Sequence, residues 1–381
     1  MSVALAVLLI SLAILSYVLL GYPALLALGV FRRAPPVAAH PALRSVSLIL
    51  AVRNGERWIR AKLETIRHLD YPRELLQVIV VSDGSTDRTE EIVRCFPEVQ
   101  LAPMPPSGKA AAINAGLAQA AGEILFFTDV RQELDPQSLK LLVAQFSDPT
   151  VGVASGELII RPAGRAEQAH LGLYWRYEKL IRKRLSRIDS VLGATGAIYA
   201  MRRELARPLP PDCLLDDVHL PLVAFFRGYR ITFVEEARAY DDPTALEVEF
   251  RRKVRTLAGN YQLLAHLPSL LTPRNRMWFH YLSHKFGRLL LPFALLGLLG
   301  ASCFLPRLWS AILLSAQAAF YGAALADLWV PEGAPGKRLT SLLRTFVVLI
   351  LATLAAASYV FLPGRWFWSA PTAAEAGKKD G

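Results

Sequence analysis

The feature that most constrains the fold is the distribution of charge, because no charged side chain occurs between Met1 and Phe31. As a helix, which rises about 1.5 Å per residue, this stretch can cross a hydrocarbon core roughly 30 Å thick. A signal peptide is the alternative, but it would begin with basic residues and carry a shorter apolar run. We therefore expect a transmembrane helix over 1–31, followed over 32–44 by a linker rich in proline and alanine.

Three further apolar segments near the end of the chain are predicted to span a membrane: Leu289–Leu305, Leu308–Leu325 and Thr345–Leu362. The first two are short, so a re-entrant segment is an alternative for one of them. Together they place three transmembrane helices within 286–364, preceded by interfacial helices over 259–285 and followed by a tail over 365–381.

Basic residues flank these segments: Arg32, Arg33, Arg274, Arg276, Lys285, Arg288, Lys337, Arg338 and Arg344. Lysine and arginine accumulate on the cytoplasmic side of spanning helices. All of these groups share one side only if the chain has four spans. We therefore expect a multi-pass protein of the inner (plasma) membrane with a cytoplasmic central domain and both termini outside, although Lys378 and Lys379 favour the opposite side for the tail.

The net charge of +11 raises the possibility of nucleic-acid binding. The bases cluster near the predicted lipid surface, however, and do not alternate with aromatics on one domain face. Membrane lipids and a diphosphate ligand are therefore the expected partners, and nucleic acid is not. The three cysteines, Cys95, Cys213 and Cys303, lack the spacing of metal ligands.

Between the apolar ends, segments typical of strands alternate with segments typical of helices, which predicts an α/β domain with a mostly parallel, Rossmann-like sheet. The expected strands are Val46–Val52, Leu76–Ser82, a short one near Val99, Glu123–Thr128 and Val151–Ile160. The expected helices are Glu56–Leu69, Asp87–Cys95, Lys109–Ala121, one after Pro136, and Val218–Arg227.

Acidic residues follow two of these strands, with Asp83 after the second and Asp129 after the fourth, while Asp216 and Asp217 come later. The carboxyl ends of parallel strands form the edge where open α/β sheets bind ligands. No glycine-rich phosphate loop follows any strand, so a bound diphosphate would need another source of positive charge. Mg²⁺ or Mn²⁺ held by carboxylate oxygen is the expected cofactor.

Five motifs occur in a fixed order: Val80-Val81-Ser82-Asp83-Gly84-Ser85-Thr86-Asp87, Gly108-Lys109 with Asn114-Ala115-Gly116, Phe127-Thr128-Asp129, Gly193-Ala194-Thr195-Gly196-Ala197, and Asp216-Asp217 with Leu220. Together they resemble the family 2 glycosyltransferases with a GT-A fold. Ser283-His284-Lys285 resembles the membrane-bound branch that includes cellulose, hyaluronan and poly-N-acetylglucosamine synthases. The resemblance covers about Ser45 to Leu257 and implies a GT-A domain over 45–258.

The resemblance implies an inverting, metal-dependent hexosyl transfer from a nucleotide-diphosphate sugar, expected to be UDP-linked, to a lipid-linked or membrane-presented glycan acceptor. Asp217 would be the catalytic base, with Asp216 as its neighbour. Asp83 would contact the uracil or ribose of the donor, and Asp129 would bind the metal and the diphosphate. Turn or helix-cap roles are the structural alternatives for all four carboxylates.

The other donor-binding residues that the resemblance implies are Arg53, Glu56, Lys109, Asn114, Arg252 and Arg255. Lys109 is expected to begin a helix, where backbone N–H groups and the helix dipole favour an anion. Arg255 stands where processive synthases carry the arginine of Q-x-x-R-W, and it could neutralise the leaving diphosphate. A basic helix on the membrane surface is the alternative for Arg252 and Arg255.

Besides Gly55, which stands where a glutamate is common, two positions depart from the family pattern. Arg131 replaces the second aspartate of the D-x-D motif, and Thr256 replaces the tryptophan of Q-x-x-R-W. The first raises the question of how metal is held, and the second weakens an assignment as a processive polysaccharide synthase. That synthase and a catalytically silent membrane scaffold are the competing functions, and the sequence leaves open whether a partner subunit takes part.

Overall fold

The computed structural model describes residues 2–161, 166–242, 246–331 and 333–362. Its central feature is an eight-stranded sheet with the order β3-β2-β1-β4-β7-β6-β8-β5. The strands are β1 (Val46–Val52), β2 (Leu76–Asp83), β3 (Val99–Met104), β4 (Ile124–Phe127), β5 (Glu133–Leu134), β6 (Val151–Ile160), β7 (Tyr199–Arg202) and β8 (Arg230–Asp241). The first four are mutually parallel, whereas β7 runs antiparallel between β4 and β6.

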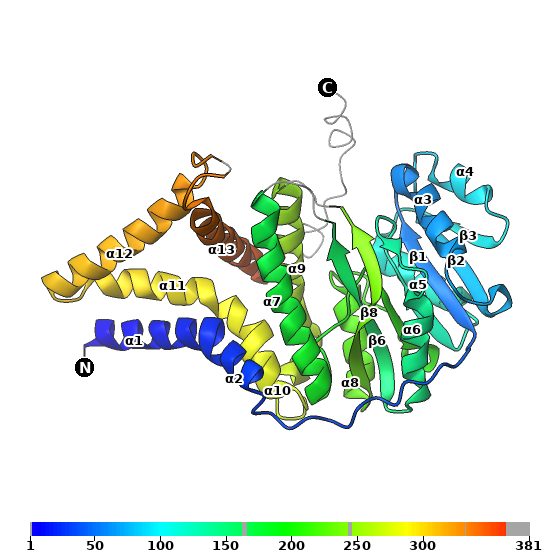
Figure 1. The fold of residues 1–381 in the computed structure, drawn as a ribbon, viewed down its shortest axis with the longest axis horizontal. Helices are drawn as coiled ribbons and strands as arrows, with labels where there is room; N and C mark the ends of the chain where they lie inside the picture. The colour runs from blue at the N-terminus through cyan, green and yellow to red at the C-terminus, as the bar shows by residue number, and fades with distance from the viewer. Residues whose placement is uncertain (1, 162–165, 243–245, 332, 363–381) are drawn as a thin grey trace.

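Helices cover both faces of the sheet (Figure 1). They are α3 (Glu56–Arg67), α4 (Thr89–Arg94), α5 (Lys109–Gln119), α6 (Ser138–Ala144) and α8 (Asp216–Phe226). Alternation along β1 directs Leu48 and Leu50 to one core and Ile49 to another, and all three side chains are buried. Apolar residues on both faces are what a strand needs when helices cover it from both sides, so β1 lies at the centre of the domain.

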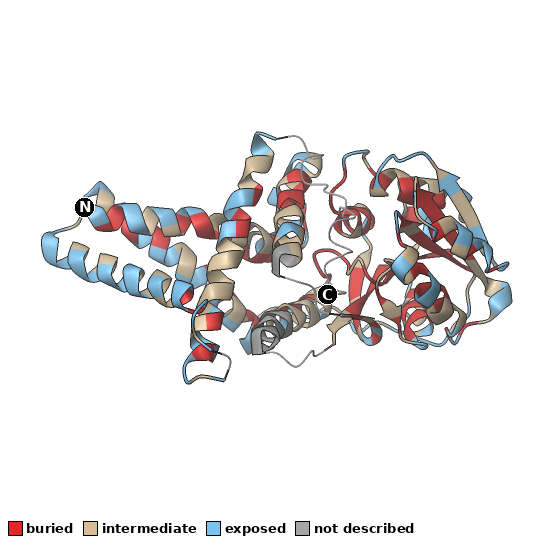
Figure 2. Cartoon of the chain, turned by 90° about the horizontal axis from the view of Figure 1, so that it is seen from above, coloured by how far each residue is buried: buried red, intermediate tan, exposed pale blue. Residues whose placement is uncertain are grey.

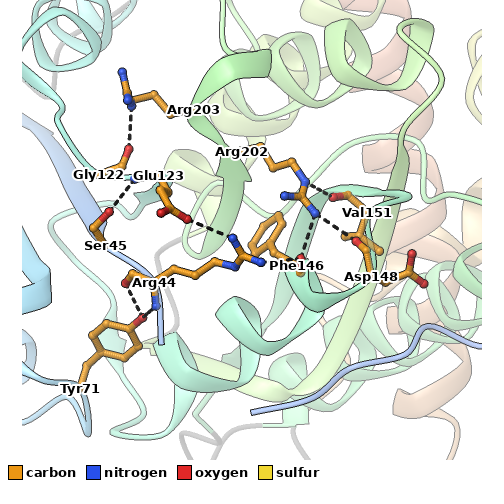
Figure 3. Close-up of polar contacts among 10 residues, drawn as sticks. All are labelled: Arg44, Ser45, Tyr71, Gly122, Glu123, Phe146, Asp148, Val151, Arg202 and Arg203. Atoms are coloured by element: carbon orange, nitrogen blue, oxygen red, sulfur yellow. Dashed lines mark hydrogen bonds and ion pairs between the residues drawn. The ribbon is translucent and has the colours of Figure 1, made fainter. Parts of the chain in front are cut away.

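Hydrogen bonds and ion pairs fix the edge of the sheet where β1 and β4 begin (Figure 3). Arg44 pairs with Glu123 at 3.0 Å, and its carbonyl accepts a 2.7 Å hydrogen bond from the Tyr71 hydroxyl. Arg202 donates to the carbonyls of Val151 and Phe146 at 2.8 and 2.9 Å. These contacts hold the amino-terminal ends of β1 and β4, where the linker enters the domain. Asp83 lies at the other end of the strands, as the last residue of β2.

Two long helices, α7 (Ala166–Ile188) and α9 (Leu246–His266), lie between the sheet and the apolar helices (Figure 1). Gly259 of α9 lies against Leu215, the residue before α8 begins. A Cβ atom at position 259 would lie 2.4 Å from the Leu215 Cγ. Glycine therefore permits α9 to pack tightly against the turn that leads into Asp216 and Asp217.

Four helical stretches are long and apolar enough to cross a membrane: Val3–Leu28, Trp278–Cys303, Arg307–Ala326 and Lys337–Val360. They contain α1 (Val3–Ser16), α2 (Tyr22–Leu28), α10 (Trp278–His280), α11 (Gly287–Cys303), α12 (Arg307–Ala326) and α13 (Lys337–Ala356). The surface of α12 is largely apolar, with Leu308 69% exposed and Trp309 59% exposed. Such a surface is compatible with lipid, so these segments could span a membrane.

The helix α13 differs from the others in direction. In Figure 1, α1, α11 and α12 extend away from the sheet domain, whereas α13 lies between α12 and the helices α7 and α9. Figure 2 shows that the helices on the side of the N-terminus carry many exposed residues. Its last turn packs Ala356 against Leu214 and Ala258, in one buried cluster. The end of α13 therefore contacts residues beside the sheet domain, namely Leu214 before α8 and Ala258 of α9.

The α/β fold predicted from the sequence is confirmed, with β1 and β6 at the predicted bounds. The sheet is more mixed than predicted, because β5, β7 and β8 were not recognised and β7 inserts antiparallel. The span that contains α11 begins at Trp278, well before Leu289, because the helix continues through Ser283, His284 and Lys285. The tail predicted over 365–381 lies outside the described residues.

Candidate active site

Lys109 lies at the centre of the candidate site. It is the first residue of α5, directly after Gly108, whose φ of +92° favours glycine. Its ammonium nitrogen lies 3.0 Å from Asp129 Oδ1 and 3.2 Å from Asp216 Oδ1. Burial opposes the charge on Lys109, yet Asp129, Asp216 and Asp217 raise its pKa above the ordinary value. One cation therefore joins carboxylates from two distant parts of the chain.

Asp83 fixes the turn that precedes Lys109. Its buried carboxylate, at the end of β2, accepts hydrogen bonds from the backbone N–H groups of Ser107 at 2.6 Å and Gly108 at 3.0 Å. These bonds orient the start of α5, which is the turn-forming role that the sequence left open. Contact between Asp83 and the donor stays a prediction.

Asp129 follows β4 at the same edge of the sheet, and its side chain is 39% exposed. Burial alone would raise the pKa of Asp129, but Lys109, Arg255 and Lys62 together lower it. Asp129 is therefore held as a carboxylate that solvent can reach. This state suits the hard oxygen ligand that Mg²⁺ or Mn²⁺ requires.

Arg131 is turned away from this carboxylate. Its guanidinium is ion-paired with Asp241 at the end of β8, and Gln132 donates to the same carboxylate at 2.7 Å. Asp241 is only 5% exposed, so the arginine neutralises a buried charge. Arg131, which replaces the second D-x-D aspartate, is therefore ion-paired with Asp241 and not with Asp129.

Lys62, on α3, also stabilises the turn that contains Asp129. This residue was not identified from the sequence. The ammonium of Lys62 is buried and donates to Thr128 Oγ1 and to the Gln132 carbonyl, both at 2.6 Å. Burial lowers the pKa of Lys62 to about 7. The available signal was a lysine on the apolar face of α3, beside Ile59, Leu63 and Ile66.

Asp216 and Asp217 begin α8, where acidic side chains interact favourably with the helix dipole. Burial raises the pKa of Asp217 to about 6, and the charge of Asp216 adds to the shift. A carboxylate with a raised pKa can accept a proton near neutral pH more readily than an ordinary aspartate. This environment suits a general base, and neither aspartate is the N-cap of α8, which is Leu215 and has no side-chain capping bond.

The loop 193–197 positions Asp217. Ala194 donates its N–H to the Asp217 carbonyl at 2.8 Å. Gly196 faces the side chain, and a Cβ atom there would lie 2.9 Å from Asp217 Oδ2. Arg182 of α7 holds the loop from outside by donating to the Thr195 hydroxyl and, at 3.3 Å, to the Gly193 carbonyl. The glycines of this motif therefore permit close packing around the carboxylate.

Three other predicted donor-binding residues lie in well-defined but different surroundings. Asn114 exchanges two hydrogen bonds with the Leu209 backbone, at 2.9 and 2.7 Å, so its amide joins α5 to the loop before α8. Glu56 is paired with Arg88 at 2.6 Å, and hydrogen bonds from Arg88 lower its pKa. Arg53 is exposed at the end of β1. Their contact with a donor stays a prediction.

Arg252 and Arg255 lie on α9, partly buried. The charge of Arg255 contributes to the lowered pKa of Asp129, which places this guanidinium in electrostatic range of the site. Asp83, Lys109, Asp129, Asp216, Asp217 and Arg255 thus converge at one edge of the sheet, and Asn114 and Glu56 are engaged elsewhere in the structure.

The side-chain oxygens at this site could hold a divalent ion only together with oxygen atoms of a bound substrate or water. Among the described residues, no group of three or more His, Cys, Asp or Glu side chains could hold a metal by itself. Asp129 and Asp216 both contact the Lys109 ammonium, so a positive charge already lies among the carboxylates at this edge. Mg²⁺ and Mn²⁺ commonly take one or two carboxylates and complete their shells with substrate phosphate and water, which matches this arrangement.

Comparison with known proteins identifies the family. The profile of glycosyl transferase family 2 matches residues 47–209. The profile of glycosyl transferase family group 2 matches residues 131–360, more than half of the chain. The chain belongs to glycosyltransferase family 2. The second profile also covers α9 and the three apolar helices near the end of the chain, so the family match is not limited to the sheet domain.

Several relatives of this glycosyltransferase are known. A probable glycosyltransferase of Bacillus subtilis (strain 168), YdaM, is 25% identical over 244 residues, which are 57% of this chain and 56% of YdaM. The poly-β-1,6-N-acetyl-D-glucosamine synthase of Staphylococcus aureus (strain COL) is 23% identical over 236 residues, 58% of this chain and 56% of the synthase. The chain spans about half the length of these curated relatives.

A solved structure shares the fold over nearly the whole glycosyltransferase. The mannosyltransferase PcManGT from Pyrobaculum calidifontis, in complex with GDP-Man and Mn²⁺, superposes with a TM-score of 0.72 at 24% identity. The match covers 93% of this chain and 99% of PcManGT. It establishes the GT-A fold with attached apolar helices.

Proposed function

We propose that the protein is an inverting glycosyltransferase that moves a sugar from a nucleotide-diphosphate sugar, UDP-linked, to a lipid-linked or membrane-presented glycan. The observation that carries this proposal is the pair of contacts from Lys109 to Asp129 and Asp216, beside a carboxylate, Asp217, whose pKa is raised to about 6. A cation and a poised base at one sheet edge are what this transfer needs.

The donor would bind with its diphosphate near Lys109, Asp129 and Arg255. Asp129 would hold Mg²⁺ or Mn²⁺ together with the diphosphate oxygens, and the ion would supply charge neutralisation when bound. Lys109 and Arg255 would stabilise the negative charge that develops on the leaving diphosphate. Manganese in the PcManGT complex is consistent with this cofactor.

Asp217 would act as the general base. Its carboxylate removes the proton from the acceptor hydroxyl, whose oxygen attacks the anomeric carbon of the sugar. The bond between that carbon and the diphosphate breaks, and the diphosphate leaves on the opposite face, so the anomeric configuration inverts. Asp216 holds Lys109 and raises the pKa of Asp217, which makes it a positioning residue in this account.

The acceptor is assigned to the membrane because of where the site lies. The helices α7 and α9 separate the sheet from the apolar helices, and α9 packs directly against the start of α8. The charge of Lys285, inside the stretch Trp278–Cys303, contributes to the pKa of Asp217, so the base is in electrostatic range of an apolar helix. The positive-inside rule then places the sheet domain in the cytoplasm at the inner membrane.

The experiment that tests this proposal is donor hydrolysis by the purified full chain, measured with a panel of UDP- and GDP-linked sugars. Hydrolysis of one donor should require Mn²⁺ or Mg²⁺ and stop on addition of a chelator. No hydrolysis of any donor, with or without metal and a membrane extract as acceptor source, would favour a catalytically silent scaffold and overturn the proposal.

A processive polysaccharide synthase is the second candidate, and the match to the poly-β-1,6-N-acetyl-D-glucosamine synthase favours it. Thr256, in the place of the Q-x-x-R-W tryptophan, favours single addition. Product length with radiolabelled donor separates the two. A single added sugar supports the first proposal, and a ladder of products supports the synthase.

A further inference from the structure

Two adjoining hollows lie where the end of α2 meets the end of α7. One is an open groove of about 560 Å³ lined by Arg32, Arg33, Ala34, Pro35, Pro36 and Ile188. The second shares Arg33 and Ile188 with it and is also lined by Leu26, Phe31, Arg184 and Arg187. The second hollow holds only about 10 Å³, and the two hollows together are lined by four arginines. We call this the arginine groove.

The four arginines have no anionic partner in the part of the chain that the structure describes. No hydrogen bond or ion pair from the side chains of Arg32, Arg33, Arg184 or Arg187 to a described residue occurs. The nearest acidic residue in sequence, Asp189, is already ion-paired with Arg276 at 3.1 Å. Four like charges in one groove repel one another, and an anion placed among them would relieve that repulsion.

Capping of α7 does not account for these side chains. The carbonyls of Arg187 and Ile188 both accept from the Ala34 N–H at 3.0 Å. Arg230 donates to the carbonyls of Ser186 and Asp189, at 3.3 and 3.1 Å. The helix end is therefore satisfied by other groups, and Arg184 and Arg187 are left to face the groove.

The position of the groove indicates a lipid. The stretch Val3–Leu28 that is suited to cross a membrane ends here, and the linker leaves α2 beside the end of α7 (Figure 1). At this end of the stretch, Leu28 is 77% exposed and Val30 is 59% exposed, so an apolar surface adjoins the groove. A headgroup phosphate at this level would have guanidinium groups around it and apolar side chains on the membrane side.

We propose that the arginine groove binds the headgroup phosphate of an anionic phospholipid, with the acyl chains on the side of the apolar stretch Val3–Leu28. Guanidinium groups can hold phosphate oxygens in bidentate pairs, and a cytoplasmic basic pocket between membrane helices suits a single anionic lipid. The lipid would join α2 to α7, two elements that otherwise meet here through backbone bonds from Ala34 and apolar contacts.

This lipid would bear on the candidate active site through α7. Arg184 and Arg187 lie within two helical turns of Arg182, which holds Thr195 and Gly193 in the loop beside Asp217. A lipid that fixes the end of α7 would therefore also fix Arg182, which holds the loop 193–197 next to Asp217. This consequence depends on the proposed function, whereas the binding site itself does not.

The test uses the full chain in nonionic detergent and native mass spectrometry. Dioctanoyl-phosphatidylglycerol is titrated, with dioctanoyl-phosphatidylcholine and inorganic phosphate as comparisons. The double variant Arg184→Gln/Arg187→Gln is compared with a control that loses the same charge on the sheet domain, Arg60→Gln/Arg73→Gln, at two exposed positions. Thermal unfolding verifies that both variants are folded.

We expect one saturable phosphatidylglycerol on the wild type and the control, and binding weakened about twentyfold in Arg184→Gln/Arg187→Gln, because each arginine near an anionic surface contributes roughly fivefold. Equal binding by that variant would overturn the proposal. Equal binding of phosphatidylcholine would remove the charge requirement. Displacement of the lipid by millimolar phosphate alone would reassign the groove to a soluble anion.

Discussion

The Lys62 ammonium donates a 2.6 Å hydrogen bond to the hydroxyl of Thr128, the residue immediately before Asp129. The same ammonium donates to the Gln132 carbonyl on the far side of the turn. One buried lysine thus holds both ends of the turn that presents Asp129, the carboxylate proposed to bind the metal. Arg131, inside that turn, is held by Asp241. A single aspartate can therefore be kept in place without the second carboxylate of the D-x-D motif.

Replacement of Lys62 by methionine keeps most of the side-chain volume and removes both hydrogen bonds. We expect the turn to loosen, so that metal-dependent donor hydrolysis falls about 10- to 100-fold and requires more Mn²⁺ for half-maximal activity. A Mn²⁺ titration at fixed donor concentration measures the effect. An unchanged Mn²⁺ requirement in a folded Lys62→Met variant would show that Lys62 only fills the core.

Gly196 faces the carboxylate of Asp217, and alanine there would bring a Cβ atom to 2.9 Å from Asp217 Oδ2. We expect Gly196→Ala to lower kcat by at least about tenfold, because the base is displaced while the donor site at Lys109 and Asp129 is intact. The matched control is Gly322→Ala on α12, where nothing lies within 4 Å of the added Cβ. Equal kinetics in the two variants would contradict the positioning of Asp217 by this loop.

The pH profile of transfer should report Asp217. A general base must be ionised, and the pKa of Asp217 is raised to about 6, so kcat/KM should rise with pH and level off above about 6. The charge of Asp216 contributes to the raised pKa, so Asp216→Asn should move this limb to lower pH. A limb that stays in place in Asp216→Asn would indicate that another group titrates.

Cysteine labelling tests the orientation in the membrane. Cys95 on the sheet domain and Cys303 at the end of α11 are both exposed, and Cys213 is buried. In intact spheroplasts, an impermeant maleimide should label Cys303 and leave Cys95 unlabelled until the membrane is permeabilised. Labelling of Cys95 in intact cells would place the sheet domain outside.

The same experiment tests the direction of α13. Because the last turn of α13 packs Ala356 against Leu214 and Ala258, we expect its end to stay on the side of the sheet domain. Phe361 is 87% exposed, so Phe361→Cys in a background without the native cysteines provides the probe. Protection in intact cells supports this packing arrangement. Labelling in intact cells would support four complete spans with both termini outside, as the positive-inside rule suggested from the sequence.

The parallel half of the sheet was predictable because each of its strands is a short apolar run ended by a polar turn. Val46–Val52 is bounded in this way, and its observed ends agree with the prediction. The antiparallel strand β7 was not predictable by the same reasoning. Tyr199–Arg202 is only four residues long, and its pairing with β4 depends on contacts between distant segments. Local pattern carries little information about such pairing.

In the candidate site, too, some residues could be predicted from the sequence and others could not. Motif order brought Asp129, Asp216 and Lys109 into one prediction, and the structure joins them through the Lys109 ammonium. Asn114 belongs to the same motif as Lys109, yet its amide is engaged by the backbone of Leu209. Lys62 was missed because its partners are a hydroxyl and a carbonyl that become neighbours only after folding. Sequence motifs identify residues near the site, whereas the fold decides which of them face it.

The central claim is that Asp217 removes the acceptor proton while other residues hold the donor. Asp217→Asn keeps the size and hydrogen-bonding shape of the side chain and removes the base. Donor affinity by calorimetry and transfer by radiolabelled sugar are measured on the same purified variant. We predict unchanged donor binding with transfer reduced at least about a thousandfold. Transfer at the wild-type rate in Asp217→Asn would contradict the account.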